Sequence, residues 1–283
     1  MSTITDKKTF SCEFFPPKTQ SAEEKLAINW KKLNAKKPDF FSVTYGAGGS
    51  TRDHTLETVS RIHNEGMPVA PHLSFGGDTA QTIENLLNTY KDKGIKRVVA
   101  LRGDMPSGMG HARLVYANEL VAFIREKTGD HFHIEVAAYP ETHPQSKSCG
   151  SDIAFLKKKF DAGANSGITQ YFYNADAYFH FIDRCQAAGI DQPIVPGIMP
   201  ISNYSSLARF SDACGAEIPR WIRKQLESYA DDSASIAAFG FEVVTELCER
   251  LLQGGAPGLH FYTMNRAKPT LTLWDNLNLD SLR

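Results

Sequence analysis

A short pattern recurs along the chain: a glycine that ends a helix is followed by a brief apolar strand and then by a polar residue. Gly66, for example, precedes the strand at residues 69–71 and then His72. The same order is found after three further glycines, Gly94, Gly163 and Gly258. Strands alternating with helices favour a parallel sheet covered by helices. Polar groups at the carboxyl ends of such strands are typical of the active site of a barrel. We therefore predict an α/β fold, a (β/α)8 TIM-type barrel.

Length and charge narrow the range of functions. The 283 residues suit one barrel of about 250 residues, and no linker interrupts them, so we expect a single catalytic domain over residues 1–283. Lys and Arg total 31 against 32 for Asp and Glu, a formal net charge of −1. This balance gives no basic footprint for nucleic acid.

The expected cellular location follows from targeting, membrane and disulfide features that the sequence lacks. The first eight residues contain no apolar stretch of the kind found in signal peptides, and no apolar run in the chain is long enough to cross a bilayer. The five cysteines are scattered and form no CxxC pair. We expect a cytoplasmic protein with reduced thiols and no membrane partner.

Eight strands and the helices between them can be placed approximately. Strands are expected at residues 10–14, 40–44, 69–71, 97–101, 132–138, 167–169, 193–197 and 259–262. The first helix is expected over residues 22–33, with Ser21 as its N-cap. Between the last two strands lie three helical stretches, at residues 204–212, 218–229 and 233–253. We interpret them as the helix after strand seven, one extra helix and the region of helix eight.

Glu13 stands near the end of an apolar strand. Burying a carboxylate there without a partner is costly. In a barrel interior its pKa would rise from about 4.3, which suits a general acid near neutral pH. The alternative is a structural ion pair with a neighbouring Arg or Lys.

Further polar residues follow other strands. The fourth strand is followed by Arg102, Gly103 and Asp104. Glycine there lets the backbone approach a ligand closely. The alternative is a turn that an Arg–Asp pair stabilises. Gln170 ends the sixth strand. Its side-chain amide can both donate and accept a hydrogen bond at the edge of a heterocycle. The alternative is a polar residue that fills a layer of the barrel interior. Three consecutive lysines, residues 157–159, form either a solvated helix face or a phosphate contact.

The positions of the histidines and of one glycine-rich turn argue against a metal site and against two common nucleotide-binding motifs. His131 and His133 have the spacing of metal ligands but precede the fifth strand, at the end of the barrel that serves stability, so we expect no metal. His72 and His143 lie at the opposite end and suit hydrogen bonds to an organic ligand. The glycine-rich turn at residues 46–49 fits neither the dinucleotide fingerprint nor the P-loop, so any nucleotide must bind to the barrel itself.

Together, segments distributed over nearly the whole chain resemble the methylenetetrahydrofolate reductase family. In family order they are residues 13–17, 42–46, 70–73, 101–104, 138–144, 161–165, 168–170, 196–200 and 260–266. The resemblance implies a TIM-type barrel and the short bacterial form, without the regulatory domain of the larger eukaryotic relatives. It also implies bound FAD, which NADH or NADPH reduces before leaving. The second substrate, 5,10-methylenetetrahydrofolate, would then take the hydride in the same place and become 5-methyltetrahydrofolate.

The resemblance also implies roles for individual residues. Glu13 would be the general acid that helps open the methylene bridge, and Asp104 would stabilise the resulting cation. The contacts to FAD would be Thr44, Tyr45, Ala47, His72, Arg102, Gly103, Asp104, Tyr116, Ala117, Tyr139, His143, Asp152, Lys158 and Lys159. The contacts to the substrates would be Glu13, Thr44, Asp104, Gln170, Phe210 and Arg266. Phe155 departs from the family pattern, because some bacterial members have a polar residue that contacts flavin there.

Two other functions stay open at this point: a pterin-binding barrel that transfers a methyl group, and a flavin- or folate-binding module without activity. Colour would separate the reductase from the methyltransferase, since only the reductase should purify yellow. The choice between NADH and NADPH also stays open, because the chain has no Rossmann residue that selects between them. We expect a homo-oligomer.

Overall fold

The computed structural model describes residues 7–45, 52–75, 78–102 and 116–283. Its strands are β1 (Thr9–Phe14), β2 (Phe40–Val43), β3 (Val69–Leu73), β4 (Arg97–Ala100), β5 (His133–Ala138), β6 (Ser166–Thr169), β7 (Ile194–Val195), β8 (Gly197–Ile198) and β9 (Gly258–Tyr262). Its helices are α1 (Gln20–Asn34), α2 (Arg52–Asn64), α3 (Ala80–Asp92), α4 (Ala117–Thr128), α5 (Cys149–Asp161), α6 (Ala175–Ala187), α7 (Tyr204–Cys214), α8 (Arg220–Ser228), α9 (Ser233–Gln253) and α10 (Ala267–Asn276), followed by the 3-10 turn η1 (Leu279–Leu282).

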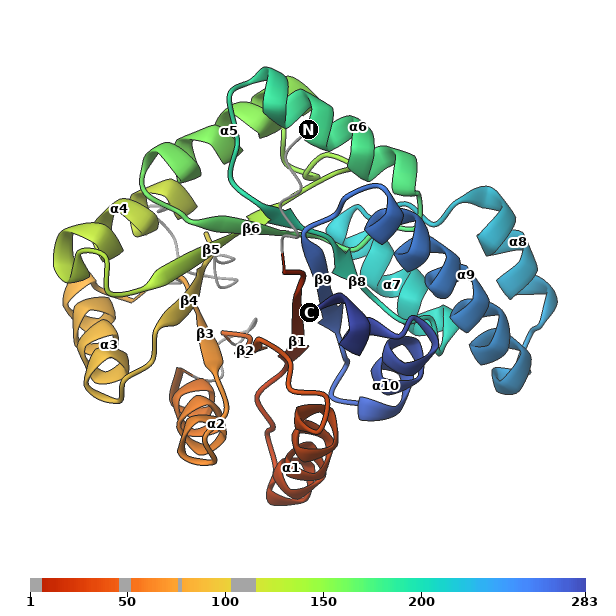
Figure 1. Ribbon diagram of the computed structural model, residues 1–283, viewed down its shortest axis with the longest axis horizontal. Coiled ribbons are helices and arrows are strands. Elements are labelled where there is room, and N and C mark those ends of the chain that lie inside the picture. Colours follow the sequence, from red (N-terminus) through yellow and green to blue (C-terminus); the bar gives the residue numbers. More distant parts are fainter. Residues whose placement is uncertain (1–6, 46–51, 76–77, 103–115) are drawn as a thin grey trace.

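The strands form one parallel sheet that curls into a nearly closed barrel, with helices around it (Figure 1). Their order is β7-β6-β5-β4-β3-β2-β1-β9-β8. Because β7 and β8 are separated by a single residue, they act as one interrupted strand, and the ring then has eight positions. The predicted (β/α)8 TIM-type barrel is confirmed.

Pro196 is the residue that interrupts this strand. Proline has no backbone N–H to donate to a ladder. Before it, β7 pairs with β6, and after it, β8 pairs with β9. The single strand that we predicted at residues 193–197 therefore divides its hydrogen bonds between two neighbours.

The last three predicted helices are found where we expected them, but the assignment of residues 233–253 to helix eight is wrong. Helices α7, α8 and α9 all lie between β8 and β9 in the chain, so the stretch assigned to the eighth unit precedes the last strand. The helix that follows the last strand is α10, which we did not predict. It packs Leu273 and Trp274 inward, and Trp274 contacts Phe10 edge-on at 5.3 Å.

Thr19, and not Ser21, is the N-cap of α1. The Thr19 side chain accepts a hydrogen bond from the backbone N–H of Ala22 at 3.2 Å. The helix therefore begins two residues earlier than predicted. Either hydroxyl could cap a helix by type, so the choice depends on where the chain turns.

Gly258 lets β9 approach β1 closely. A side chain at this position would place its Cβ 1.8 Å from the carbonyl oxygen of Thr9. Thr9 and Gly258 begin a five-residue register that brings Glu13 opposite Tyr262. The closure of the ring thus depends on a residue without a side chain.

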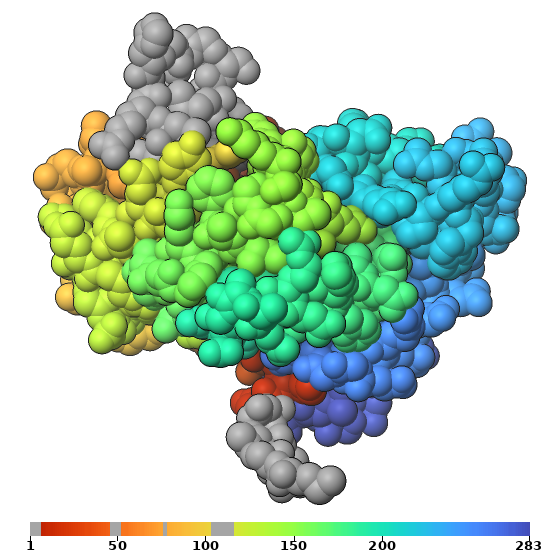
Figure 2. Space-filling model, turned by 90° about the horizontal axis from the view of Figure 1, so that it is seen from above, coloured from red at the N-terminus to blue at the C-terminus, as the bar shows by residue number. Residues whose placement is uncertain are grey.

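The inserted helices lie toward one end of the barrel. Figure 2 shows the residues of α7 and α8, coloured cyan, on the opposite side of the molecule from the first described residues of β1, coloured red. Since β1 starts at the amino ends of the strands, α7 and α8 stand at the side of the carboxyl ends. They are therefore placed beside the end where barrel enzymes carry their sites.

Candidate functional site

The interior of the barrel is built in three layers, which follow from the alternation of side chains along each strand. The middle layer is a small apolar cluster separate from the main core: Phe40, Ala70, Val99 and Ile168. Two residues before Val99 and Ile168, on the same face, stand Arg97 and Ser166 of a lower polar layer. Two residues after Phe40 and Ala70 stand Ser42 and His72 of an upper polar layer.

Glu13 is the centre of the upper layer. Its Oε2 lies 3.4 Å from the Nε2 of His260, 3.3 Å from the Nε2 of His72 and 3.4 Å from the hydroxyl of Ser42. The Glu13 side chain is 10% exposed, so the carboxylate is almost fully withdrawn from water. Three strands, β2, β3 and β9, thus direct polar side chains at the one carboxylate that β1 supplies.

The expectation of a raised pKa for Glu13 is wrong. Burial raises the pKa, but the charge of the nearby His72 and a hydrogen bond from His260 outweigh burial. The net result is a pKa lowered to about 2. Glu13 is therefore ionised at neutral pH, and its partners are imidazoles, not the Arg or Lys that we considered.

His260 and Ser11 were missed as members of this site. The Ser11 hydroxyl lies 2.7 Å from the Nδ1 of His260, and both side chains are buried. Ser11 and Glu13 are two residues apart on one strand, so alternation alone would place them on the same face. The pairing with His260 could not be read from that spacing, because His260 is 247 residues away from Glu13.

His72 has an unfilled hydrogen-bonding position. Its Nε2 is within ion-pair distance of Glu13, but the geometry is not that of a hydrogen bond. Among the described residues this buried nitrogen has no hydrogen-bond partner. Such an atom fits the edge of an organic ligand, as expected for a residue that contacts a cofactor.

The lower polar layer is a separate network. The Glu135 carboxylate is buried and binds the guanidinium of Arg97, the hydroxyl of Ser166 at 2.5 Å and the Nε2 of His133 at 3.3 Å. Burial raises the pKa of Glu135, but the hydrogen bond from His133 and the charge of Arg97 hold the pKa below its usual range. His133 is therefore engaged in an ion-pair network, and the described residues contain no group of side chains suited to a metal ion.

The residues expected to contact FAD lie on one arc of the ring. Thr44 and Tyr45 follow β2, His72 is in β3, Arg102 follows β4, and Tyr139 and His143 follow β5. The rest belong to the beginning of α4 and to α5: Tyr116, Ala117, Asp152, Lys158 and Lys159. Because β2 to β5 are consecutive neighbours in the sheet, these residues share one side of the barrel mouth. Ala47, Gly103 and Asp104 lie outside the described residues.

Several of these side chains are held by protein groups. Asp152 accepts the backbone N–H of His143 at 2.7 Å, which ties the loop after β5 to α5. Tyr45 donates to Asp78 at 2.5 Å. The ammonium of Lys159 donates to the carbonyl of Ala137 at 2.7 Å, and burial lowers its pKa to about 8.

A flat surface adjoins this arc. The rings of Tyr116 and Phe155 are stacked at 6.0 Å, both exposed, and the ammonium of Lys158 lies 5.0 Å from the centre of the Phe155 ring. Phe155 thus presents an aromatic face beside a cation.

Thr44, expected to contact both FAD and substrate, lies on the FAD arc, and Asp104 lies outside the described residues; the other residues expected to contact the substrates lie on the remaining arc of the ring. Glu13 is in β1, Gln170 follows β6, and Arg266 follows β9, where it is exposed. Gln170 accepts the backbone N–H of Tyr171 at 2.9 Å through its side-chain oxygen. Phe210 on α7 is 37% exposed, whereas Leu207 is buried, so Phe210 is not a core residue of that helix.

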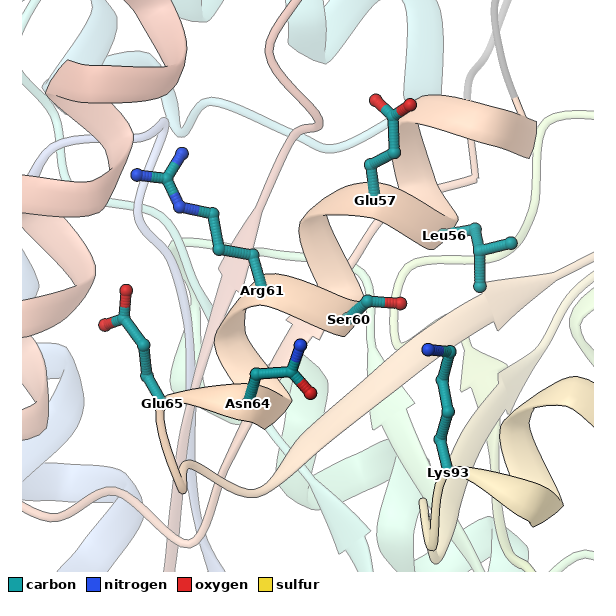
Figure 3. A pocket seen from close by; sticks show the side chains of 7 residues that line it. All are labelled: Leu56, Glu57, Ser60, Arg61, Asn64, Glu65 and Lys93. Atoms are coloured by element: carbon teal, nitrogen blue, oxygen red, sulfur yellow. The ribbon is translucent and has the colours of Figure 1, made fainter.

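A surface groove of about 490 Å³ lies elsewhere, between α2 and the end of α3 (Figure 3). It is lined by Leu56, Glu57, Ser60, Arg61, Asn64, Glu65 and Lys93. Arg61 is already paired with Glu23, and Glu65 accepts from the indole of Trp30 at 3.0 Å. None of the predicted site residues lines this groove, so we place the site at the barrel mouth. No helix within the described ranges is long and apolar enough to span a membrane.

Comparison with known proteins gives a consistent result. Residues 1–278 match the family model described as methylenetetrahydrofolate reductase. The chain is 39% identical to 5,10-methylenetetrahydrofolate reductase of Escherichia coli (strain K12), over 95% of this chain and 90% of that protein. It is 41% identical to methylenetetrahydrofolate reductase (NADH) 1 of Arabidopsis thaliana, over 95% of this chain and 48% of that protein.

A solved structure supports the fold alone. An uncharacterized protein from Clostridium thermocellum, which binds two copies of 5-methyl-5,6,7,8-tetrahydrofolic acid, superimposes with a TM-score of 0.71. The alignment covers 99% of this chain and 97% of that one at 17% identity. At this identity the likeness extends to the barrel and not to its site.

Proposed function

Since the chain belongs to the methylenetetrahydrofolate reductase family, we propose that it reduces 5,10-methylenetetrahydrofolate to 5-methyltetrahydrofolate with FAD as cofactor and NADH or NADPH as donor. Its curated relatives are named as this oxidoreductase. The observation that carries the proposal is the buried cluster of Glu13, His72 and His260 at the carboxyl end of the strands, in a chain of this family. One side of that cluster adjoins the residues expected to hold a flavin and the other side those expected to hold folate.

The residues of the β2–β5 arc fit a bound dinucleotide. His72 offers its unfilled nitrogen, and the ammonium of Lys158 on α5 suits a phosphate, while that of Lys159 already donates to the carbonyl of Ala137. Bound FAD would supply hydride transfer between the nicotinamide and folate. The two substrates would use the same place in turn, giving ping-pong kinetics.

Glu13 would move the proton of this reaction. Opening the methylene bridge leaves electrons on a nitrogen that must be protonated. The Glu13 carboxylate lies at the mouth side of the interior and can deliver a proton there. Because it is ionised at neutral pH in the cluster, it must first take up a proton.

Anaerobic mixing with NADH tests the proposal. The purified protein should be yellow, and its flavin absorbance should bleach with NADH or NADPH and return when 5,10-methylenetetrahydrofolate is added. Flavin that stays oxidised with both nicotinamides would overturn the reductase proposal. A colourless protein that still binds folate would favour a methyltransferase.

For Asp104, we expect the Asn variant to be impaired mainly with folate. A negative charge matters most when the opened folate becomes cationic, and such stabilisation is commonly worth about 3 kcal/mol. Stopped-flow rates of the two half-reactions measure this separately. A variant with wild-type folate reduction would remove Asp104 from the mechanism.

For Phe210, we expect the Ala variant to raise the apparent KM for folate or for the nicotinamide and to leave Tm almost unchanged. The ring is exposed on α7, so it can stack on a flat substrate without supporting the core. Leu207→Ala is the matched control, because Leu207 is buried on the same helix. It should lower Tm by several degrees, as is usual for a core truncation of roughly 3 kcal/mol. A large fall in Tm for Phe210→Ala with unchanged KM values would contradict stacking.

A further inference from the structure

We propose that Glu141 is a positioning residue for Phe210. Its carboxylate fastens the turn between α7 and α8 to the loop after β5, and thereby sets where α7 holds the Phe210 ring. The inference rests on the proposed function, in which that ring stacks on a flat substrate. Glu141 takes no part in the chemistry proposed above, yet one of its oxygens is buried.

The first support is a hydrogen bond between two distant segments. The Oε2 of Glu141 accepts the backbone N–H of Glu217 at 2.8 Å, although the two residues are 76 positions apart in the chain. Glu141 follows β5, and Glu217 lies in the turn between α7 and α8. The bond therefore joins a strand end of the barrel to the segment that directly follows α7.

The second support is a close fit beside that bond. Gly215 ends α7 in the left-handed conformation, with φ 75°, and its N–H donates to the carbonyl of Ser211. A Cβ at Gly215 would lie 2.6 Å from the Cγ of Pro144, which belongs to the loop after β5. Both the conformation and the close approach favour glycine. The end of α7 thus packs directly on the loop that carries Glu141.

The third support lies at the residue next to Phe210. Ser211 is buried, and its hydroxyl lies 3.0 Å from the hydroxyl of Tyr171, which follows β6. The backbone N–H of Tyr171 in turn donates to the side chain of Gln170 at 2.9 Å. Two barrel loops therefore hold the end of α7. One contains His143, expected to contact FAD, and the other contains Gln170, expected to contact folate.

The fastening is sensitive to the protonation of Glu141. Its Oε1 is buried and has no hydrogen-bond partner among the described residues. Burial and the charge of Glu217 raise the pKa of Glu141 more than the hydrogen bond from the Glu217 backbone lowers it, so the pKa is about 7. The other titratable groups on this side are the Tyr171 hydroxyl from the segment after β6 and the Cys214 thiol from α7. Neither is a cation that would stabilise the carboxylate.

The neutral form of Glu141 therefore fastens α7 most firmly. Its pKa in the fold lies above that of an unfolded carboxyl, about 4.3, so its contribution is fully present below that value. The contribution is lost as the pH rises through about 7. We expect α7 to be held less firmly at pH 8 than at pH 6.

The test measures apparent KM values of the holoenzyme for NADH and for folate at pH 6 and pH 8. The variants are Glu141→Ala, Glu141→Gln, Phe210→Ala and the double variant with both alanines. At pH 6, Glu141→Ala should raise the same KM that Phe210→Ala raises by about fivefold, the usual effect of one lost hydrogen bond, and leave kcat and flavin content within about twofold. Glu141→Gln keeps an oxygen that accepts the N–H and stays neutral. Its KM should remain within about twofold of wild type at pH 6 and lack the wild-type rise at pH 8.

Two further measurements separate positioning from general support of the fold. Because Glu141 acts through Phe210, adding Glu141→Ala to Phe210→Ala should raise KM no further. Hydrogen exchange of the α7 amides at pH 6, which needs neither substrate nor activity, should be about fivefold faster in Glu141→Ala. Glu249→Ala removes an exposed carboxylate of α9 and is the matched control that should change neither KM nor exchange.

Two outcomes would overturn the inference. One is a wild-type KM in Glu141→Ala at pH 6, and the other is an equal effect of this substitution with and without the Phe210 ring. If Glu141→Ala does not fold, Glu141→Gln decides, because it keeps the hydrogen bond. A rise in its KM at pH 8 equal to that of wild type would remove Glu141 from this role.

Failure of the proposed function is recognised separately. Flavin that does not bleach in the wild type would remove the reductase proposal, while exchange of the α7 amides would still measure the fastening by Glu141. A wild type that bleaches with NADH and reduces folate, beside a normal Glu141→Ala variant, would remove the inference alone.

Discussion

Glu13→Gln is expected to abolish most of the folate half-reaction while flavin reduction by NADH continues. Hydride transfer from nicotinamide needs no proton from Glu13, whereas opening the methylene bridge does. Glutamine has nearly the same shape but cannot deliver a proton, so folate reduction should fall by about 10²-fold or more. Stopped-flow absorbance of the flavin, recorded separately for each half-reaction, measures the split.

Glu57→Gln is the matched control for this substitution. Glu57 is exposed on α2, lines the outer groove (Figure 3) and is not among the residues expected to contact FAD or the substrates, so the same change should alter neither half-reaction. Equal losses in both half-reactions of Glu13→Gln would mean that the buried carboxylate supports the fold and not the chemistry.

Arg97→Met is expected to give the largest loss of stability. Methionine keeps much of the apolar stem but removes the cation that faces the buried carboxylate of Glu135. An uncompensated buried charge costs about 3–5 kcal/mol, and we expect about 3 because Ser166 and His133 still contact the carboxylate. Urea denaturation at pH 7 measures the change in the free energy of unfolding.

The pH dependence gives this prediction a second readout. The pKa of Glu135 is lowered in the fold, so its stabilising contribution is present above the pKa of the unfolded carboxyl and is lost as the pH falls through the folded pKa. A protonated Glu135 needs no cation. The difference between wild type and Arg97→Met should therefore be smaller at pH 5 than at pH 7.

Lys157→Met serves as the control for Arg97→Met. Lys157 forms an exposed ion pair with Asp161 at 2.9 Å on α5, a type worth about 0.3–0.5 kcal/mol. A cost for Arg97→Met as small as that of Lys157→Met would show that the lower layer tolerates an unpaired Glu135.

Local patterns in the sequence were sufficient for most of the barrel. Glycines that end helices and apolar strands followed by polar residues are local signals, so they placed the strands to within a few residues. The division of one strand at Pro196 was not predicted, because it depends on which neighbours the two halves meet. Helix α10 was missed because its inward residues pack on β1, 250 or more residues earlier in the chain.

The site could be predicted as a list of residues but not as an electrostatic environment. Strand ends identified Glu13 and His72, and family resemblance added the rest. The direction of the pKa shift of Glu13 was wrong because two imidazoles oppose burial: the charge of His72 from β3, and a hydrogen bond from His260 of β9, which is 247 residues away in the chain. The pKa of a buried carboxylate is raised or lowered by the groups beside it. Those groups are known only once the pairing of the strands is known.

The pairing of β1 with β9 also affects how the chain folds during its synthesis. Thr9 pairs with Gly258, so a ribosome that adds about 5–20 residues per second reaches the partner strand roughly ten to fifty seconds after β1 has been made. During that interval one edge of β1 has no neighbour, and open strand edges invite pairing with other chains. The nascent protein thus carries Glu13 without His260 until translation passes β9, and overproduction should place its aggregation risk in this window. A chaperone that shields β1 during synthesis would raise the yield of active enzyme more than one that acts on the finished chain.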